Sequence, residues 1–161
     1  MKRPCVLWIE DSARLELRNL VGPLLFSPKF EFSLAEDITT AVHLLRAKPF
    51  DGVIVDIRLP PGTDPEWRRL YQASGFDRVH AQLGIKLLYW LLAGDISIHP
   101  SSPPTWIKPH NVGIFTVESR GEVEKHLNEL GIRVFRQKTA GLRDTTLLEL
   151  IDEMLQQSMR Q

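Results

Sequence analysis

The 161-residue sequence has only one cysteine, Cys5, so no disulfide can form within the chain. This favours a reducing compartment, and we expect the protein in the cytoplasm. The sequence also lacks an excess of either charge, because lysine plus arginine and aspartate plus glutamate both number 20. A protein that grips the phosphate backbone normally shows a basic excess, so we expect no nucleic-acid partner. No apolar run approaches the roughly 18 residues of a membrane span, and we expect no membrane association.

Several catalytic motifs are also missing. There is no glycine-rich phosphate loop, which argues against a Walker-type nucleotide site and a dinucleotide-binding fingerprint. There is no Gly-x-Ser-x-Gly elbow of the kind that serine hydrolases use. The five histidines show no tight ligand spacing, which argues against a zinc site; they are His43, His80, His99, His110 and His126.

What the sequence does contain is an alternation of apolar runs and amphipathic stretches. The runs that read as strands cover residues 5–9, 30–32, 53–55, 112–117 and 132–135. Helical patterns follow them, the first capped by Ser12 and bent or ended at Gly22-Pro23, the second capped by Asp37. This alternation predicts an α/β fold, a doubly wound five-stranded parallel sheet with helices on both faces. The length suits a single domain, residues 1–161.

The interval between the third and fourth predicted strands is too long for a regular alternation of strands and helices. From Val53 to Val117 the chain uses 65 residues, about twice the length of a strand–helix–strand unit. The expected helix lies at 79–93, which leaves two insertions, about 60–78 and 95–111. Residues 65–71 suggest a short helix in the first insertion. In each insertion the simpler interpretation is a loop held to its own domain by a tryptophan, and the alternative is a docking surface.

Polar residues stand where the predicted strands end. Glu10-Asp11 follows the first run, Asp56 the third, Thr116 lies in the fourth and Lys138 follows the fifth. In a parallel sheet these ends meet at one edge, where ligands bind. Three carboxylates together require a cation, and an all-oxygen set favours Mg²⁺. A carboxylate beside Mg²⁺ and a lysine is suited to accept a phosphoryl group.

These motifs resemble the receiver domain of the two-component response-regulator family, of the chemotaxis receiver type. The resemblance rests on four stretches in order, which are VLWIEDS (6–12), VIVDIRLP (53–60), IFTV (114–117) and VFRQK (134–138). It covers nearly the whole chain apart from the insertions. It implies a flavodoxin-like sheet of order 2-1-3-4-5, and it assigns roles to individual residues.

By this resemblance, Asp56 is the phosphoacceptor. Glu10 and Asp11 correspond to the acidic pair that holds Mg²⁺, and Asp56 and the backbone carbonyl of Arg58 complete the metal site. The cofactor that the resemblance implies is therefore Mg²⁺.

Three further residues correspond to the response machinery. Thr116 would bond a phosphoryl oxygen, Lys138 would pair with the phosphoryl group, and Phe135 would be the aromatic switch that follows the threonine. In the family this switch alters the face made by the fourth helix, fifth strand and fifth helix. That face would bind a downstream protein target or form a homodimer.

The sequence departs from the family pattern at the mouth of the site. Val117 stands where a small residue is favoured and would narrow access to the acyl phosphate. Thr139 replaces the usual proline, which puts the reach of Lys138 in question. We also expect an exposed ion pair between Arg58 and Glu118, and we hypothesise that it slows hydrolysis of the acyl phosphate.

The sequence therefore predicts a stand-alone receiver that takes a phosphoryl group on Asp56 from a sensor histidine kinase or a histidine phosphotransfer protein. Such a chain is a signalling domain and not a turnover enzyme. One alternative is a phosphorylation-independent interaction module on the same fold. Another is a Mg²⁺-dependent phosphohydrolase, but that class needs a second aspartate where this chain has Arg58.

Overall fold

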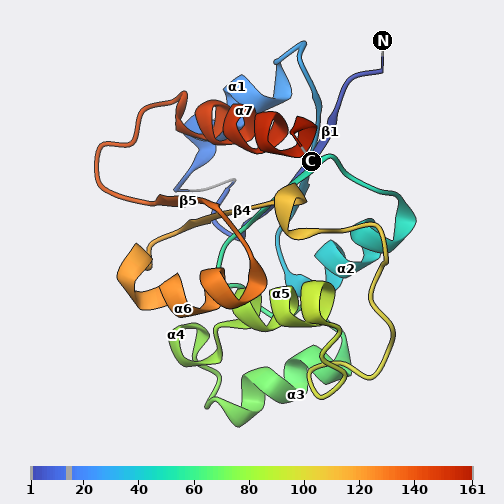
Figure 1. Cartoon of the computed structure of the whole chain (residues 1–161). Coiled ribbons are helices and arrows are strands. Elements are labelled where there is room, and N and C mark those ends of the chain that lie inside the picture. The colour runs from blue at the N-terminus through green and yellow to red at the C-terminus, as the bar shows by residue number, and fades with distance from the viewer. Residues whose placement is uncertain (1, 14–15, 161) are drawn as a thin grey trace.

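A five-stranded parallel sheet forms the centre of the molecule (Figure 1). The computed structural model describes residues 2–13 and 16–160. The strands are β1 (Cys5–Ile9), β2 (Glu31–Ala35), β3 (Gly52–Val55), β4 (Val112–Thr116) and β5 (Val134–Gln137). Their order is β2-β1-β3-β4-β5 and every neighbouring pair is parallel. This confirms the predicted flavodoxin-like sheet.

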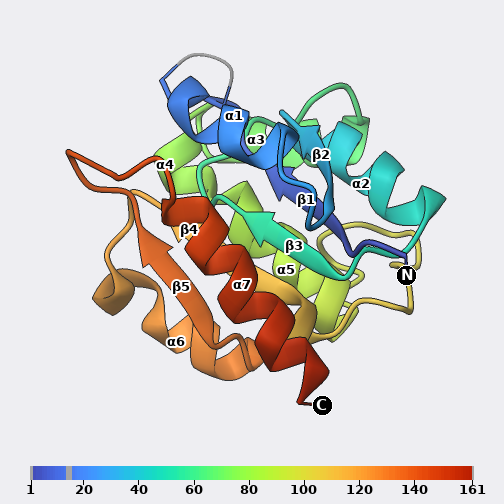
Figure 2. The ribbon, with the colours of Figure 1, turned by 90° about the horizontal axis from the view of Figure 1, so that it is seen from above.

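Helices cover both faces of the sheet, as predicted (Figures 1 and 2). On one face lie α1 (Arg18–Leu25) and α7 (Thr146–Met159), and on the other lie α2 (Ile38–Ala47), α5 (Leu83–Ala93) and α6 (Arg120–Leu130). Two additional helices, α3 (Pro65–Ala73) and α4 (Arg78–Ala81), lie outside α5, and a 3-10 turn, η1 (Pro109–Asn111), precedes β4. Within the described ranges, every helix is too short or too polar to cross a membrane.

The central strand β1 shows why its sequence is apolar without interruption. Val6 and Trp8 pack in the cluster under α1 and α7, while Leu7 and Ile9 pack in the cluster under α2, α5 and α6. All four side chains are fully buried. Each burial contributes about 1.5–3 kcal/mol, so both faces of the strand stabilise the sheet that carries the site.

The first helix begins later than predicted. It begins at Arg18, after Leu17, so the predicted cap at Ser12 is wrong. Pro23 lies inside the helix and does not end it. Proline removes only one backbone donor, and the next turn still forms because the N–H of Phe26 donates to the carbonyl of Gly22 at 3.1 Å.

The predicted helix at 79–93 is confirmed over 83–93 as α5, but it does not extend back to Val79, because Gln82 interrupts it. Gln82 adopts a left-handed conformation with φ of 45°, and it separates α4 from α5. The N–H of Gly84 donates to the carbonyl of Ile57 at 3.0 Å, so the first turn of α5 is fixed against the segment that follows β3. Because α4 immediately precedes the turn at Gln82, fixing the start of α5 also fixes the position of α4.

The fifth strand begins later than the predicted Ile132. The N–H of Ile132 donates to the carbonyl of Leu127 at 2.9 Å, and Gly131 has a φ of 74°. Ile132 therefore belongs to the end of α6, where a left-handed glycine satisfies the last carbonyls. The predicted glycine stop for this helix is confirmed.

Tryptophans hold both insertion stretches to the body, and the short helix predicted at 65–71 is confirmed as α3. Trp67 of α3 is fully buried and meets the ring of Trp90 of α5 edge-on, with centroids 5.9 Å apart. Trp106 packs on Phe50 with centroids 6.2 Å apart and donates its Nε1–H to the carbonyl of Leu45 at 3.0 Å. These contacts agree with the interpretation that the stretches are anchored to their own domain.

The two stretches are also joined to each other. His99 Nε2 lies 3.2 Å from Asp64 Oδ2, and His99 Nδ1 lies 2.8 Å from Ser101 Oγ. The His99 ring stands 5.6 Å from Trp67 and 5.5 Å from Trp90. The polar contacts and the tilted ring contacts together join the two stretches into one unit that lies against α5.

Candidate functional site

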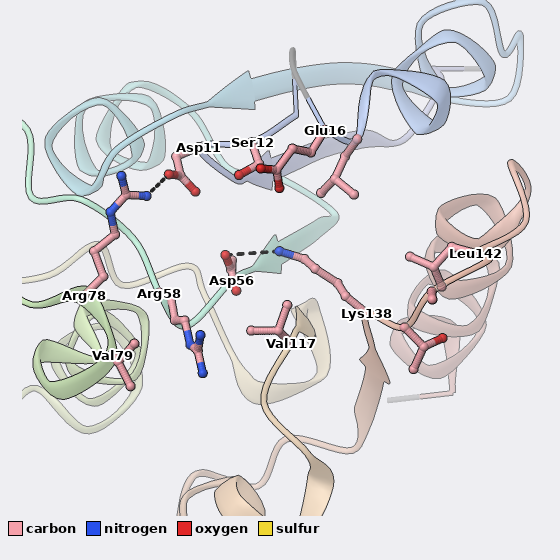
Figure 3. A pocket seen from close by; sticks show the side chains of 13 residues that line it. Asp11, Ser12, Glu16, Asp56, Arg58, Arg78, Val79, Val117, Lys138 and Leu142 are labelled. Atoms are coloured by element: carbon pink, nitrogen blue, oxygen red, sulfur yellow. Dashed lines mark hydrogen bonds and ion pairs between the residues drawn. The ribbon is translucent and has the colours of Figure 1, made fainter.

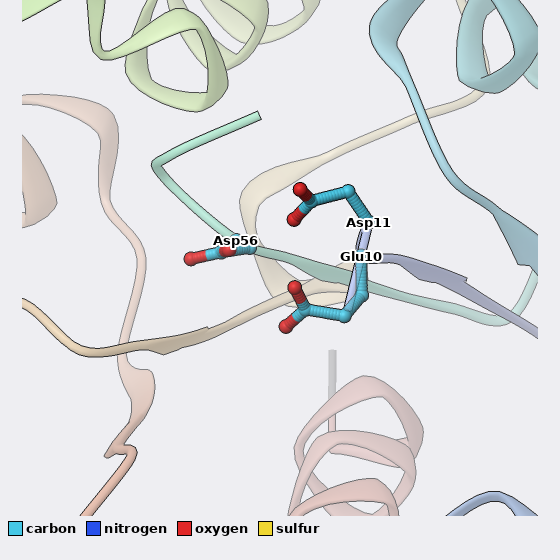
Figure 4. A group of neighbouring side chains, drawn as sticks. All are labelled: Glu10, Asp11 and Asp56. Atoms are coloured by element: carbon cyan, nitrogen blue, oxygen red, sulfur yellow. The ribbon is translucent and has the colours of Figure 1, made fainter. Parts of the chain in front are cut away.

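Three carboxylates meet at the carboxyl edge of the sheet (Figure 4). Glu10 and Asp11 follow β1, and Asp56 follows β3, which is the neighbouring strand. One oxygen from each lies within 4.8 Å of the others. Glu10 is fully buried, Asp56 is 4% exposed and Asp11 is half-buried. The structure thus brings together the three side chains that the sequence placed at strand ends.

Lys138 supplies a cation between two of these carboxylates. Its Nζ lies 3.1 Å from Asp56 Oδ2 (Figure 3). The same ammonium forms an ion pair with Glu10. The backbone N–H of Lys138 donates to the carbonyl of Thr116 at 2.7 Å, which extends the pairing of β4 and β5 by one residue. The lysine therefore reaches Asp56, although Thr139 follows it in place of the family's proline.

Burial shapes the electrostatics of Glu10. Desolvation and the neighbouring charge of Asp56 raise the pKa of Glu10 to about 8, and Lys138 opposes this rise. Desolvation is the largest cause, because the Glu10 side chain is fully buried.

Thr116 and Phe135 lie where the switch residues were predicted, on adjacent strands. Thr116 is fully buried, and its Oγ1 accepts a hydrogen bond of 3.3 Å from the N–H of Glu118. Phe135 is 8% exposed and packs inward, with the guanidinium of Arg120 5.9 Å from its ring centroid. The ring is thus part of the core beside α6, and its role as a switch stays a prediction.

Arg58 and Glu118 form the expected ion pair, with 2.8 Å between Nε and Oε1. The prediction that the pair is exposed is wrong for one partner, because the Glu118 side chain is only 4% exposed against 36% for Arg58. The backbone N–H of Glu118 donates to Oγ1 of Thr116, and this hydrogen bond holds Glu118 against the end of β4. Val117 is exposed and lines the same opening. The role of the Arg58 carbonyl as a metal ligand stays a prediction.

The carboxylates open into a cleft of about 570 Å³ (Figure 3). Asp11, Asp56 and Lys138 line it, and the Lys138 side chain points toward Asp56. Arg78 and Val79 of α4 also line it, and they come from outside the strand ends. The guanidinium of Arg78 forms an ion pair with Asp11.

Sequence reasoning did not assign Arg78 to the site. The nearest signal was Asp77, whose side chain accepts from the N–H of Val79 at 2.8 Å and caps α4. A cap marks where a helix starts but not which part of the fold it faces. The ion pair between Arg78 and Asp11 depends on the turn at Gln82, and no local sequence pattern predicts that turn.

The donor set fits a hard divalent cation. Its candidate ligands are carboxylate oxygens on two adjacent strand ends, without histidine or cysteine, which suits Mg²⁺. Glu10 and Asp56 share one lysine and Asp11 has one arginine, so the three carboxylates face two cations. An additional cation would therefore meet a negative charge that the protein itself only partly neutralises.

Comparisons with known proteins show the fold. No family model matches the sequence, and no curated protein matches it. Among solved structures, a CheY-like response regulator receiver domain protein from Methanospirillum hungatei JF-1 is 17% identical, with a TM-score of 0.62 over 99% of this chain and 98% of that chain.

Two further structures give the same result. Chemotaxis protein CheY4 of Vibrio cholerae is 19% identical with a TM-score of 0.60, covering 95% of this chain and 99% of that chain. A response regulator from Thermotoga maritima is 16% identical with a TM-score of 0.58, covering 96% and 98%. The chain therefore has the fold of CheY-like receiver domains, as its motifs predicted.

Proposed function

We propose that residues 1–161 form a single receiver domain whose Asp56 accepts a phosphoryl group from a sensor histidine kinase or a histidine phosphotransfer protein. The observation that carries the proposal is the position of Asp56. It is buried at the carboxyl edge of a receiver fold, 3.1 Å from Lys138 and clustered with Glu10 and Asp11. The composition of the chain and its single cysteine support a cytoplasmic setting.

The proposed step is a phosphoryl transfer between two protein side chains. A carboxylate oxygen of Asp56 attacks the phosphorus of the donor phosphohistidine, the P–N bond breaks, and the imidazole leaves with the electron pair and takes up a proton. The product is an acyl phosphate. Bound Mg²⁺ would supply charge neutralisation for the transferring group, with Glu10, Asp11, Asp56 and the Arg58 carbonyl as its ligands.

The chain's own residues provide the remaining stabilisation. The ammonium of Lys138, held beside Asp56, is placed to pair with a phosphoryl oxygen on that residue. The Thr116 hydroxyl is buried at the end of the adjacent strand and would turn toward the same group. Movement of Thr116 would release space that Phe135 can fill, and this coupling would change the face formed by α6, β5 and α7.

The proposed outcome is signalling, without turnover of a substrate. The altered face would bind a downstream protein target or a second copy of the chain, and neither nucleic acid nor membrane is proposed as a partner. Arg58 supports this view, because it occupies the position where a phosphohydrolase on a similar fold carries its general acid.

Intact-mass measurement after incubation with acetyl phosphate and Mg²⁺ tests the proposal. We expect one added phosphoryl group on the unaltered chain, and none with Asp56→Asn or when the metal is chelated. Asp51→Asn is a matched control, because Asp51 lies at the opposite end of β3 and is exposed. An adduct on Asp56→Asn would contradict the assignment.

A second function has a specific observation in its favour. The ion pair between Arg78 and Asp11 satisfies one of the candidate metal ligands from within the chain. This is the arrangement expected of a receiver fold kept as a phosphorylation-independent interaction module. A titration with beryllofluoride and Mg²⁺, followed by NMR, distinguishes the two, because only a working receiver shifts the resonances of α6 and β5.

A further inference from the structure

Arg78 is the one residue of α4 whose side chain forms an ion pair with a proposed metal ligand in the described structure. Its guanidinium contacts Asp11 Oδ2, and both residues line the cleft that contains Asp56 (Figure 3). The Arg78 side chain is 48% exposed and that of Asp11 is 18% exposed. The contact therefore lies at the mouth of the site and not in the core.

The position of Arg78 is determined by the acceptor segment itself. A Cβ on Gly84 would lie 2.7 Å from Cα of Ile57 and still closer to the carbonyl oxygen of Asp56, so only glycine lets α5 approach this closely. The left-handed Gln82 then turns the chain, and α4 is held over the cleft. The same contact thus positions both the acceptor and the arginine.

We propose that Arg78 is an internal competitor of the divalent cation at Asp11, and that metal binding displaces it and frees α4 from the site. The inference rests on the proposed magnesium site. It gives the first insertion a regulatory function, which is control of metal binding at Asp11.

Electrostatics supports competition over co-operation. A divalent cation bound by Asp11 and a guanidinium on the same carboxylate repel each other, and a hard cation holds oxygen ligands at short range. The arginine is half exposed, so its pairing with Asp11 is weak enough for a divalent ion to replace. Glu10 and Asp56 share Lys138 as their counter-ion, whereas Asp11 has Arg78, so the competition centres on Asp11.

Release of Arg78 would alter a short and weakly held element. α4 has only four residues, and Val79 beside Arg78 is 44% exposed. Besides the ion pair, α4 is held by the Asp77 cap, the buried Ala81, the contact of Lys86 with the carbonyl of Ala81, and contact with α3. The metal state of the site would thereby be transmitted to the surface made by the first insertion.

Calorimetric titration of Mg²⁺ into the full chain tests the inference. We expect Arg78→Ala and Arg78→Gln to bind Mg²⁺ about fivefold more tightly than the unaltered chain, because the competing cation is gone. Arg68→Ala is the matched control, since Arg68 is an exposed arginine on α3. It should bind Mg²⁺ with unaltered affinity.

The results separate failure of this inference from failure of the proposed function. If the unaltered chain and both Arg78 variants bind Mg²⁺ equally, Arg78 is not a competitor and the inference alone is overturned. If none of them binds Mg²⁺, the proposed metal site and the inference both fail.

Hydrogen exchange gives an independent readout that does not depend on affinity. Saturating Mg²⁺ should accelerate exchange of the amides of residues 79–82 in the unaltered chain. In Arg78→Ala the same amides should already exchange rapidly without metal and should change little on its addition. Unchanged exchange in the unaltered chain, at Mg²⁺ concentrations where calorimetry shows saturation, would overturn the release of α4.

Discussion

The ammonium nitrogen of Lys138 lies 3.1 Å from Oδ2 of Asp56, and the same ammonium pairs with Glu10. One lysine therefore serves two buried carboxylates from adjacent strands. Its own side chain is 11% exposed, so water screens these interactions poorly. The arrangement makes the site sensitive to any change in its number of cations.

Loss of this lysine should destabilise the fold and make it dependent on metal. In Lys138→Ala two buried carboxylates lose their counter-ion, and we expect a loss of about 3–5 kcal/mol in the free energy of unfolding. Mg²⁺ should restore part of that loss. Denaturant unfolding with and without Mg²⁺ measures it, with Lys125→Ala on the exposed side of α6 as the control. Equal stability of the two variants would contradict this role for Lys138.

Gly84 should be intolerant of a side chain, because its position leaves no room beside Asp56 and Ile57. Gly84→Ala should cost about 1–3 kcal/mol in unfolding free energy and slow phosphorylation of Asp56. Gly121 is the matched control, since both glycines are the second residue of an eleven-residue helix and a Cβ on Gly121 would meet nothing within 4 Å. Gly121→Ala should be neutral or stabilising by up to about 1 kcal/mol. The reverse order of stabilities would refute the close approach.

The pair between Arg58 and Glu118 should protect the acyl phosphate from water. We expect Arg58→Ala and Glu118→Gln each to shorten the lifetime of phosphorylated Asp56 roughly twofold to fivefold, a barrier change of about 0.4–1 kcal/mol. The double variant should lose no more than either single one, because both remove the same contact. Arg69→Ala, which breaks the exposed pair with Glu66, should leave the lifetime unchanged. If Arg58→Ala leaves the lifetime of phosphorylated Asp56 unchanged, the ion pair does not protect the acyl phosphate.

The side chain of Tyr89 joins α5 to α6 through hydrogen bonds, and the pKa of its hydroxyl should show whether those bonds form. Its hydroxyl donates to Glu129 at 2.5 Å and lies 2.9 Å from His126 Nδ1. Burial and the hydrogen bond to Glu129 raise the pKa of Tyr89 to about 12 from its ordinary 10. The stability that the neutral hydroxyl contributes is thus complete below pH 10 and is lost as pH rises through about 12.

Ultraviolet titration measures this directly, because the chain has only two tyrosines. Tyr89→Phe should remove the phenol that titrates near pH 12 and should lower stability at neutral pH by about 1 kcal/mol. It should also make α6 easier to move when beryllofluoride binds. A Tyr89 that titrates at its ordinary pKa of 10 would show that the contact to Glu129 does not form.

Much of the fold and the site was predictable because both depend on local patterns. Buried central strands such as Cys5–Ile9 are apolar without interruption, since they pack on both faces. Carboxylates directly after such strands must lie at one edge of a parallel sheet, and this is why Glu10, Asp11 and Asp56 were found together.

The rest depended on contacts between distant segments. Arg78 reaches Asp11 across 67 residues of sequence, and only the turn at Gln82 and the approach of Gly84 direct it there. The burial of Glu118 follows from its bond to Thr116 and its pairing with Arg58, which comes from another strand end. Such contacts have no periodicity, and the sequence offers no signal for them.

The central claim is that Asp56, among three clustered carboxylates, accepts the phosphoryl group. Borohydride reduction of the phosphorylated chain converts the modified aspartate to homoserine, and peptide mass spectrometry then identifies its position. The account predicts homoserine at residue 56 alone, formed only after incubation with acetyl phosphate and Mg²⁺. Reduction at Glu10 or Asp11, with Asp56 intact, would contradict it.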